Sequence, residues 1–317
     1  MGKSNKITDA ALLTAAYIIL LLITAFIPLL GTFTFFALPI PFILYTAKYN
    51  WQPALMMFIV ASLLSLIFAT LFSLPMTLLM AIGGIMIGSA IYESKSAYET
   101  WARGAVGFVI GLIFVFIIIQ FLFQINIYDE IDMVIAETMN MMQTMASQVG
   151  MESEINEQLS VIEEQMYTFK DLIPASMAII SILMAFVSQW LSYKVMNRIE
   201  QRKLYFPTFK SFNLPVSLIW VYFIALLGSF FITENEGGAY LVVMNVILLS
   251  MVLLAIQGFS FVFFYADHKN YSKAIPITLV IITLIIPGIF LLLVRILGII
   301  DLGFGLKKRI ENAEKEN

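Results

Sequence analysis

The sequence predicts an all-α, polytopic membrane protein with about ten transmembrane segments and one acidic helical hairpin outside the membrane. Of its 317 residues, 61% are hydrophobic and only 12% are charged, and the mean hydropathy is +0.92. These values exclude an ordinary soluble domain. Apolar runs separated by short turns fill both ends of the chain. Between them, residues 124–172 hold ten of the 21 acidic residues and a single base, Lys170.

The apolar runs are long enough to cross a bilayer, because a helix needs about 20 residues to span a hydrocarbon core about 30 Å thick. The second run is short and contains Pro39 and Pro41, so a broken or tilted crossing is expected there. The last run is too long for one crossing, and Pro287-Gly288 divides it into two. The ten predicted segments cover approximately 8–30, 35–47, 53–72, 76–92, 104–123, 173–193, 215–231, 239–264 and two crossings within 275–306.

The distribution of positive charge predicts the orientation, because lysine and arginine are retained on the cytoplasmic side. With ten crossings and both termini cytoplasmic, the inner face receives 16 of the 18 bases. Lys170 falls outside and Arg295 falls within the membrane. The expected location is therefore the bacterial cytoplasmic (inner) membrane, with the acidic stretch on its outer face.

Four parts of the chain are expected on this basis. A first membrane block covers 1–123, the extracytoplasmic hairpin 124–172, a second membrane block 173–306, and a basic then polar cytoplasmic tail 307–317. Helical spacing of apolar residues predicts the two helices of the hairpin. The two stripes consist of Ile131, Ile135, Thr138, Met142, Met145 and Val149, and of Ile155, Leu159, Ile162, Met166 and Phe169.

A few polar residues inside the apolar segments are candidate ligands. Arg295 is the one base placed within the bilayer, and such a charge marks a functional site or requires a structural partner. Asn245 lies at a similar predicted depth, with Gln120 and Gln124 nearer the outer surface. These four residues are predicted to line an outward-facing pocket for an anionic or hydrogen-bonding solute. The alternative is that Arg295 snorkels to the interface or only ties the terminal hairpin to its neighbours.

Small residues four apart allow helices to approach closely in lipid. Such pairs occur at Gly84 and Gly88 and at Gly107 and Gly111, where intramolecular packing is the ordinary interpretation. A third pair, Ala11 and Ala15, could instead form a flat stripe on which another protein docks.

Enzymatic chemistry has little support in this sequence, and we expect no catalytic residue, metal or cofactor. The chain has no cysteine and a single histidine, His268, which excludes thiolate sites and two-histidine zinc sites within this sequence. His268 is expected in a solvated loop. Asp301 precedes the basic residues Lys307 and Lys308 and is expected to cap a helix or form a salt bridge.

The start Thr8-Asp9-Ala10-Ala11-Leu12-Leu13-Thr14-Ala15-Ala16, the Pro39-Ile40-Pro41 segment and the ending Arg295-Ile296-Leu297-Gly298-Ile299-Ile300-Asp301 together resemble the YybS-like family of predicted bacterial membrane proteins. The first block also resembles the S components of energy-coupling-factor transporters, in which a small-residue stripe docks to the coupling subunit, and the rod-shape protein MreD. The first resemblance implies no catalytic residue, and the second implies docking through Ala11 and Ala15.

Two functions follow as expectations. One is a non-enzymatic membrane component that binds or transports a small molecule, with an S-component-like core and a membrane coupling subunit as partner. The other is a structural or regulatory scaffold that binds partner proteins through the acidic outer hairpin and the basic inner loops. Contact with the lipid bilayer is expected in both cases, and binding to nucleic acid in neither.

Overall fold

The computed structural model describes residues 3–149, 152–232 and 237–315. These residues form helices and connecting turns, without a strand among them. The contacts divide the chain into two compact units, which are described separately. Unit 1 comprises Met1–Lys170 and Met177–Phe206, and unit 2 comprises Asp171–Ser176 and Pro207–Asn317.

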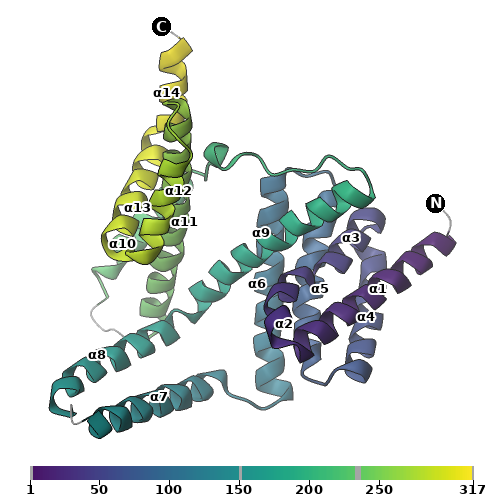
Figure 1. The fold of residues 1–317 in the computed structure, drawn as a ribbon, viewed down its shortest axis with the longest axis horizontal. Coiled ribbons are helices and arrows are strands. Elements are labelled where there is room, and N and C mark those ends of the chain that lie inside the picture. Colours follow the sequence, from purple (N-terminus) through teal and green to yellow (C-terminus); the bar gives the residue numbers. More distant parts are fainter. Residues whose placement is uncertain (1–2, 150–151, 233–236, 316–317) are drawn as a thin grey trace. The chain divides into compact units, whose positions relative to one another are not determined.

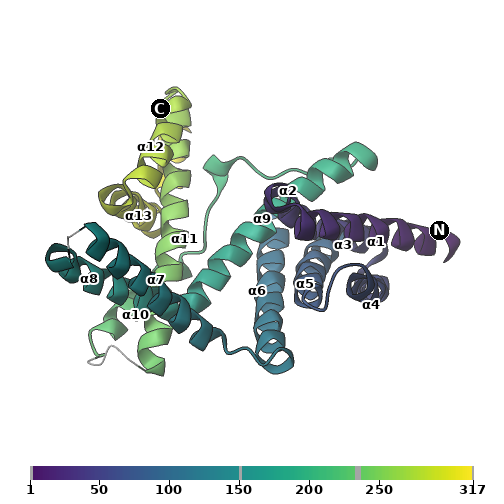
Figure 2. The same ribbon diagram turned by 60° about the horizontal axis from the view of Figure 1, so that its bottom comes forward.

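Unit 1 begins with the apolar helices of the first block (Figure 1). Helix α1 lies across α3 and α4 (Figure 2), while α5 packs against α3, α4 and α6. The second span runs from Pro28 to Tyr49, so it begins earlier than the predicted 35–47 and is not short. A 3-10 turn, Phe35–Ala37, breaks it between α2 and α3. The helices are α1 (Lys3–Phe26), α2 (Pro28–Thr34), α3 (Ile40–Tyr49), α4 (Trp51–Phe68), α5 (Ser73–Tyr92) and α6 (Ala97–Leu122).

Glycines set the close packing in this unit. A Cβ at Gly84 would lie 2.9 Å from the carbonyl oxygen of Pro39, the residue before α3, and one at Gly111 would lie 2.8 Å from Leu79 Cδ1 on α5. The fully buried Tyr17 of α1 donates its hydroxyl to Thr77 Oγ1 of α5 (2.8 Å). The glycine pairs therefore serve intramolecular packing, as their ordinary interpretation predicts.

Helix α9 (Ile173–Ile199) packs mainly with the first-block helices. Trp101 donates from Nε1 to the Ile182 carbonyl (2.8 Å), and buried Gln189 donates to the Ala97 carbonyl (2.9 Å). Ser188 donates to the Phe36 carbonyl (3.2 Å). The order of segments placed this helix in a second block beginning at residue 173. The contacts instead group residues 177–206 with unit 1. The predicted block boundary at residue 173 and the boundary between the two units therefore differ.

The acidic stretch forms the predicted pair of helices, α7 (Ile127–Val149) and α8 (Glu152–Asp171). Ile135, Met139 and Leu159 are buried together at their interface, with Ile131, Met142, Ile162 and Met166 packed around them. Lys170 and Asp132 form an ion pair between the two helices (2.5 Å). The side chains of Val149 and Ile155, which belong to the predicted stripes, lie outside the described residues.

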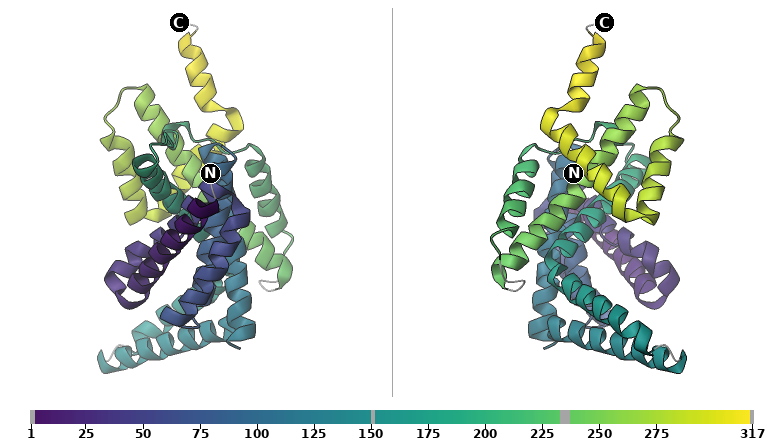
Figure 3. Two further views of the ribbon diagram at one scale, coloured as in Figure 1. Left: turned by 90° about the vertical axis from the view of Figure 1, so that its right-hand side faces the viewer. Right: turned by 90° about the vertical axis from the view of Figure 1, so that its left-hand side faces the viewer.

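In unit 2 the described residues after Pro207 form four apolar helices and a C-terminal polar one. Pro287 begins α13, so the predicted division of the last apolar run is confirmed. Helices α11 and α12 run side by side from the short loop that joins them (Figure 3). The helices are α10 (Ser217–Ser229), α11 (Gly238–His268), α12 (Ala274–Ile285), α13 (Pro287–Phe304) and α14 (Leu306–Lys315), with a 3-10 turn, η2 (Phe209–Ser211), ahead of them.

Within the described residues, eight helical stretches are long and apolar enough to span a membrane, with α2 and α3 counted as one, and α10 and α12 are shorter apolar helices. Each of the ten predicted segments thus overlaps an apolar helix, and eight of these stretches reach spanning length. The chain is thus an all-α, polytopic membrane protein.

Candidate functional site

A polar cavity of about 660 Å³ opens in unit 2 at the end where α11, α13 and α14 meet the η2 segment. Its size is within the usual range of small-molecule pockets, about 300–1,000 Å³. The lining residues are Lys210, Ser211, Asn213, Val216, Phe264, Asp267, His268, Asn270, Asp301, Leu302, Gly305, Lys307, Lys308 and Glu311.

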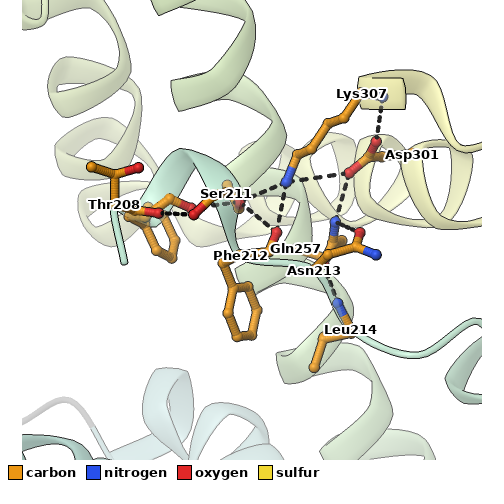
Figure 4. A network of polar contacts seen from close by, with 10 residues as sticks. Thr208, Ser211, Phe212, Asn213, Leu214, Gln257, Asp301 and Lys307 are labelled. Atoms are coloured by element: carbon orange, nitrogen blue, oxygen red, sulfur yellow. Dashed lines mark hydrogen bonds and ion pairs between the residues drawn. The ribbon is translucent and has the colours of Figure 1, made fainter. Parts of the chain in front are cut away.

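The buried carboxylate of Asp301 is the centre of a polar network beside this cavity (Figure 4). Asp301 is 2% exposed and accepts a hydrogen bond from Gln257 Nε2 (2.6 Å). It also accepts from the backbone N–H of Lys307 (3.3 Å), at the start of α14. Gln257 accepts from Leu214 N (2.9 Å) and donates to Asn213 Oδ1 (3.1 Å). A buried charge requires such partners, and Asp301 has them.

The ammonium group of Lys307 is the positively charged member of this network. Its Nζ donates to the Phe212 carbonyl (2.7 Å) and to Ser260 Oγ (2.7 Å), and lies 3.6 Å from Asp301 Oδ2. Burial lowers the pKa of Lys307 from its ordinary value of 10.5, and the Asp301 carboxylate opposes that shift. These hydrogen bonds connect α14 to Phe212, the residue after η2, and to Ser260 on α11. The expected salt bridge or capping role of Asp301 is confirmed.

Two glycines explain why Gln257 and Asp301 meet. A Cβ on Gly298 of α13 would overlap the Leu254 carbonyl of α11, and one on Gly258 would overlap the Val294 carbonyl. The two backbones can approach this closely only without side chains. Gln257 precedes Gly258 and Asp301 follows Gly298 by nearly one turn, so both lie beside this contact.

The cavity lining carries charges of both signs. Lys210 pairs with Asp267 (2.5 Å), and Asp301 pairs with Lys307. Lys308 and Glu311 are exposed on α14. The ring of His268 stacks on Phe264, with centroids 5.9 Å apart, at the end of α11 rather than in the predicted loop. Such a lining suits a polar ligand that presents both positive and negative groups.

The predicted ligands have other environments. Asn245 accepts from Ala175 N (2.7 Å) and donates to the Asp171 carbonyl (2.8 Å), so it supports the first turn of α9. Arg295 is half-buried on α13 and makes no hydrogen bond or ion pair within the described ranges. Neither residue lines the polar cavity.

The remaining predicted residues lie in unit 1. Gln120 near the end of α6 and Gln124 after it are exposed, and Gln124 has a positive φ of 55°. Ala11 and Ala15 are also exposed, on α1. A ligand-binding role for the first two and a docking role for the alanines stay predictions.

Sequence reasoning did not single out Gln257, Asn213 or Ser260. The available signal was weak, because Gln257 is one polar residue within the long apolar run of α11. Its partner Asp301 lies 44 residues further along the chain. Periodicity describes one helix at a time and does not pair residues on different helices.

Comparison with known proteins adds the family. The chain matches the family described as "Predicted membrane protein (DUF2232)" over residues 15–302. It is 28% identical over 312 residues to "Uncharacterized protein YybS" of Bacillus subtilis (strain 168), which covers 98% of this chain and 100% of that protein. No solved structure matches. The chain therefore belongs to the DUF2232 family of predicted membrane proteins, and the YybS-like resemblance of its sequence is confirmed.

Proposed function

We propose that this protein is a non-enzymatic membrane component that binds a small polar molecule in the cavity of unit 2. The observation that carries the proposal is the cavity itself, about 660 Å³ in volume and lined by charges of both signs. Its floor is the Asp301–Lys307 network, whose charged groups already satisfy one another. Groups held in this way position a ligand and are poorly placed to exchange protons with it.

We place this cavity on the cytoplasmic side of the membrane, with both termini. Support comes from the bases that gather at this end of unit 2, because the positive-inside rule retains them in the cytoplasm. They are Lys210, Lys269, Lys273, Lys307, Lys308 and Arg309. A transport role, with the first block acting as an S-component-like core, is one form of this proposal.

The test is a thermal-shift screen of the purified full chain against amino acids, vitamins, nucleobases and small anions, with bound ligand measured by mass spectrometry. Asn213→Ala and Lys308→Ala, which alter the lining, should reduce ligand-induced stabilisation. Lys269→Ala is the control. It removes a basic residue at the same end of unit 2 that does not line the cavity, so the ligand-induced thermal shift should be unchanged. Equal shifts in all three variants, with a bound ligand demonstrated, would overturn this assignment of the site.

A scaffold is the second candidate, and one observation favours it. The α7–α8 hairpin presents exposed acidic side chains, including Glu130 and Glu137, and α1 exposes Ala11 and Ala15. Chemical crosslinking in cells followed by purification tests this role. A stoichiometric membrane partner crosslinked through these surfaces, together with no ligand in the cavity, would favour the scaffold over the binding protein.

A further inference from the structure

Helix α7 has a second apolar face besides the one it packs against α8. Val134, Met141 and Met145 recur at helical spacing next to the buried stripe, and their side chains are 57%, 57% and 61% exposed. Ala136 and Gln143, one small and one polar, are exposed on the opposite side of the helix. The helix is therefore apolar over a wider arc than the contact with α8 uses.

The start of α7, including Val134 of this face, and the end of α8 line an apolar groove with a volume of about 570 Å³. Phe169 of α8 lines it and is 71% exposed, and among the described residues Glu130 and Lys170 are the charged ones in the lining. The lining consists of Ile125, Ile127, Glu130, Ile131, Val134, Ile135, Met166, Phe169 and Lys170. Exposed apolar surface of this extent marks a contact with a protein or a membrane.

The position of the groove along the chain identifies its occupant. The groove begins at Ile125, three residues after the end of the apolar span of α6 at Leu122, and ends at Lys170, three residues before the span of α9 begins at Ile173. Three residues reach at most about 10 Å. The first and last lining residues along the chain therefore lie within about 10 Å of the membrane boundary that these two helices cross.

The direction of α7 agrees with this placement. From the end of α6, α7 runs crosswise to it (Figures 1 and 3). Because α6 spans the bilayer, a helix that runs crosswise from its end follows the membrane surface. Amphipathic helices in this position bury their apolar face among the headgroups and upper acyl chains.

We propose that the exposed apolar face of the α7–α8 hairpin is bound to lipid at the membrane interface, with the groove occupied by acyl chains. The acidic side chains of α7 give no attraction to anionic lipid. Attachment must therefore depend on buried apolar area, so it should occur in zwitterionic bilayers and should be no stronger in anionic ones. The inference is independent of the cavity in unit 2.

Site-directed spin labelling tests this directly, because the chain contains no cysteine. Val134→Cys and Met141→Cys place a label on the apolar face, one helical repeat of seven residues apart. Ala136→Cys and Gln143→Cys have the same spacing on the opposite side and are the matched controls, since residues two apart differ by about 200° around a helix. The labelled full-length protein is reconstituted in phosphatidylcholine vesicles and in phosphatidylglycerol vesicles.

Labels at positions 134 and 141 should collide with dissolved oxygen several-fold more than with a water-soluble nickel complex, and labels at 136 and 143 should show the reverse. Both results should hold in the two kinds of vesicle. Equal access of the nickel complex at all four positions would place the face in water. Spectral broadening at 134 that disappears on dilution with unlabelled protein would assign the groove to a second copy. If neither reagent reaches the labels at 134 and 141 in the diluted sample, another protein covers the apolar face. Each of these three results overturns the proposal.

Discussion

Asp301 and Lys307 form a buried ion pair, 3.6 Å apart, across the junction of α13 and α14. Gly305 allows the pair to form, because its left-handed φ of 60° ends α13 and redirects the chain. The side chain of Lys307 then lies near the carboxylate of Asp301, six residues earlier in the chain. The pair holds the basic C-terminal helix against the wall of the cavity.

The first prediction concerns the energy of this pair. Asp301→Asn and Lys307→Met should each lower the free energy of unfolding by about 3 to 5 kcal/mol, because each leaves a buried charge without its partner. The double variant should lose less than the sum of the two. Unfolding of the purified protein in detergent, followed by circular dichroism, measures all three. Additive losses would show that the two charges do not interact.

The pH dependence of stability provides a second prediction. The pKa of Lys307 is lower in the folded protein than its ordinary value of 10.5, so the unfolded chain binds more protons between the two values. The contribution of Lys307 to the free energy of unfolding therefore rises with pH between the folded and the unfolded pKa, and it is constant below the folded pKa. The unfolding temperature of the native protein, minus that of Lys307→Met, should increase as pH rises toward 10.5. A difference that falls over this range would contradict the burial of the ammonium group.

The third prediction addresses the contact between α11 and α13. Gly298→Ala introduces a Cβ that overlaps the Leu254 carbonyl, so the helices must separate and the free energy of unfolding should fall by about 3 kcal/mol, the upper part of the range for overpacked cores. Gly303→Ala on the same helix is the control, because its Cβ would meet only Ile219 Cδ1 at 3.6 Å. The control should be neutral or slightly stabilising. Thermal unfolding of both variants measures this, and equal losses would contradict the contact.

The fourth prediction concerns topology. Single cysteines at Gly150, Asn235 and Pro287 should react from outside the cell with an impermeant thiol reagent. Cysteines at residues 50, 97, 200, 270 and 312 should react only after permeabilisation, because the positive-inside rule places them in the cytoplasm. Labelling of position 312 in intact cells would contradict the two separate crossings by α12 and α13.

The fifth prediction separates Arg295 from the cavity of unit 2. Arg295 does not line that cavity, so Arg295→Met should keep the fold and the ligand-induced thermal shift. If Arg295 instead anchors a solute, the shift should disappear in Arg295→Met and return only in part in Arg295→Lys, because a point charge does not reproduce a bidentate fork. The same ligand screen distinguishes the two results.

The sequence by itself determined the class of protein, the ten apolar segments, the break at Pro287 and the two helices of the acidic hairpin. These features depend on run length and periodicity, which are local properties of the chain. The positions of the glycine pairs in unit 1 were likewise visible, because a helix repeats its face every three to four residues.

Only the tertiary structure decided which helices pack together and which polar residues meet. Asn245 and Arg295 were grouped by predicted depth, but depth does not determine which way a side chain points. Asn245 turns to the backbone of the α9 start, while Gln257, Asp301 and Lys307 meet because two glycines on different helices let α11 and α13 touch. A contact over 44 residues depends on packing, and no local pattern encodes it.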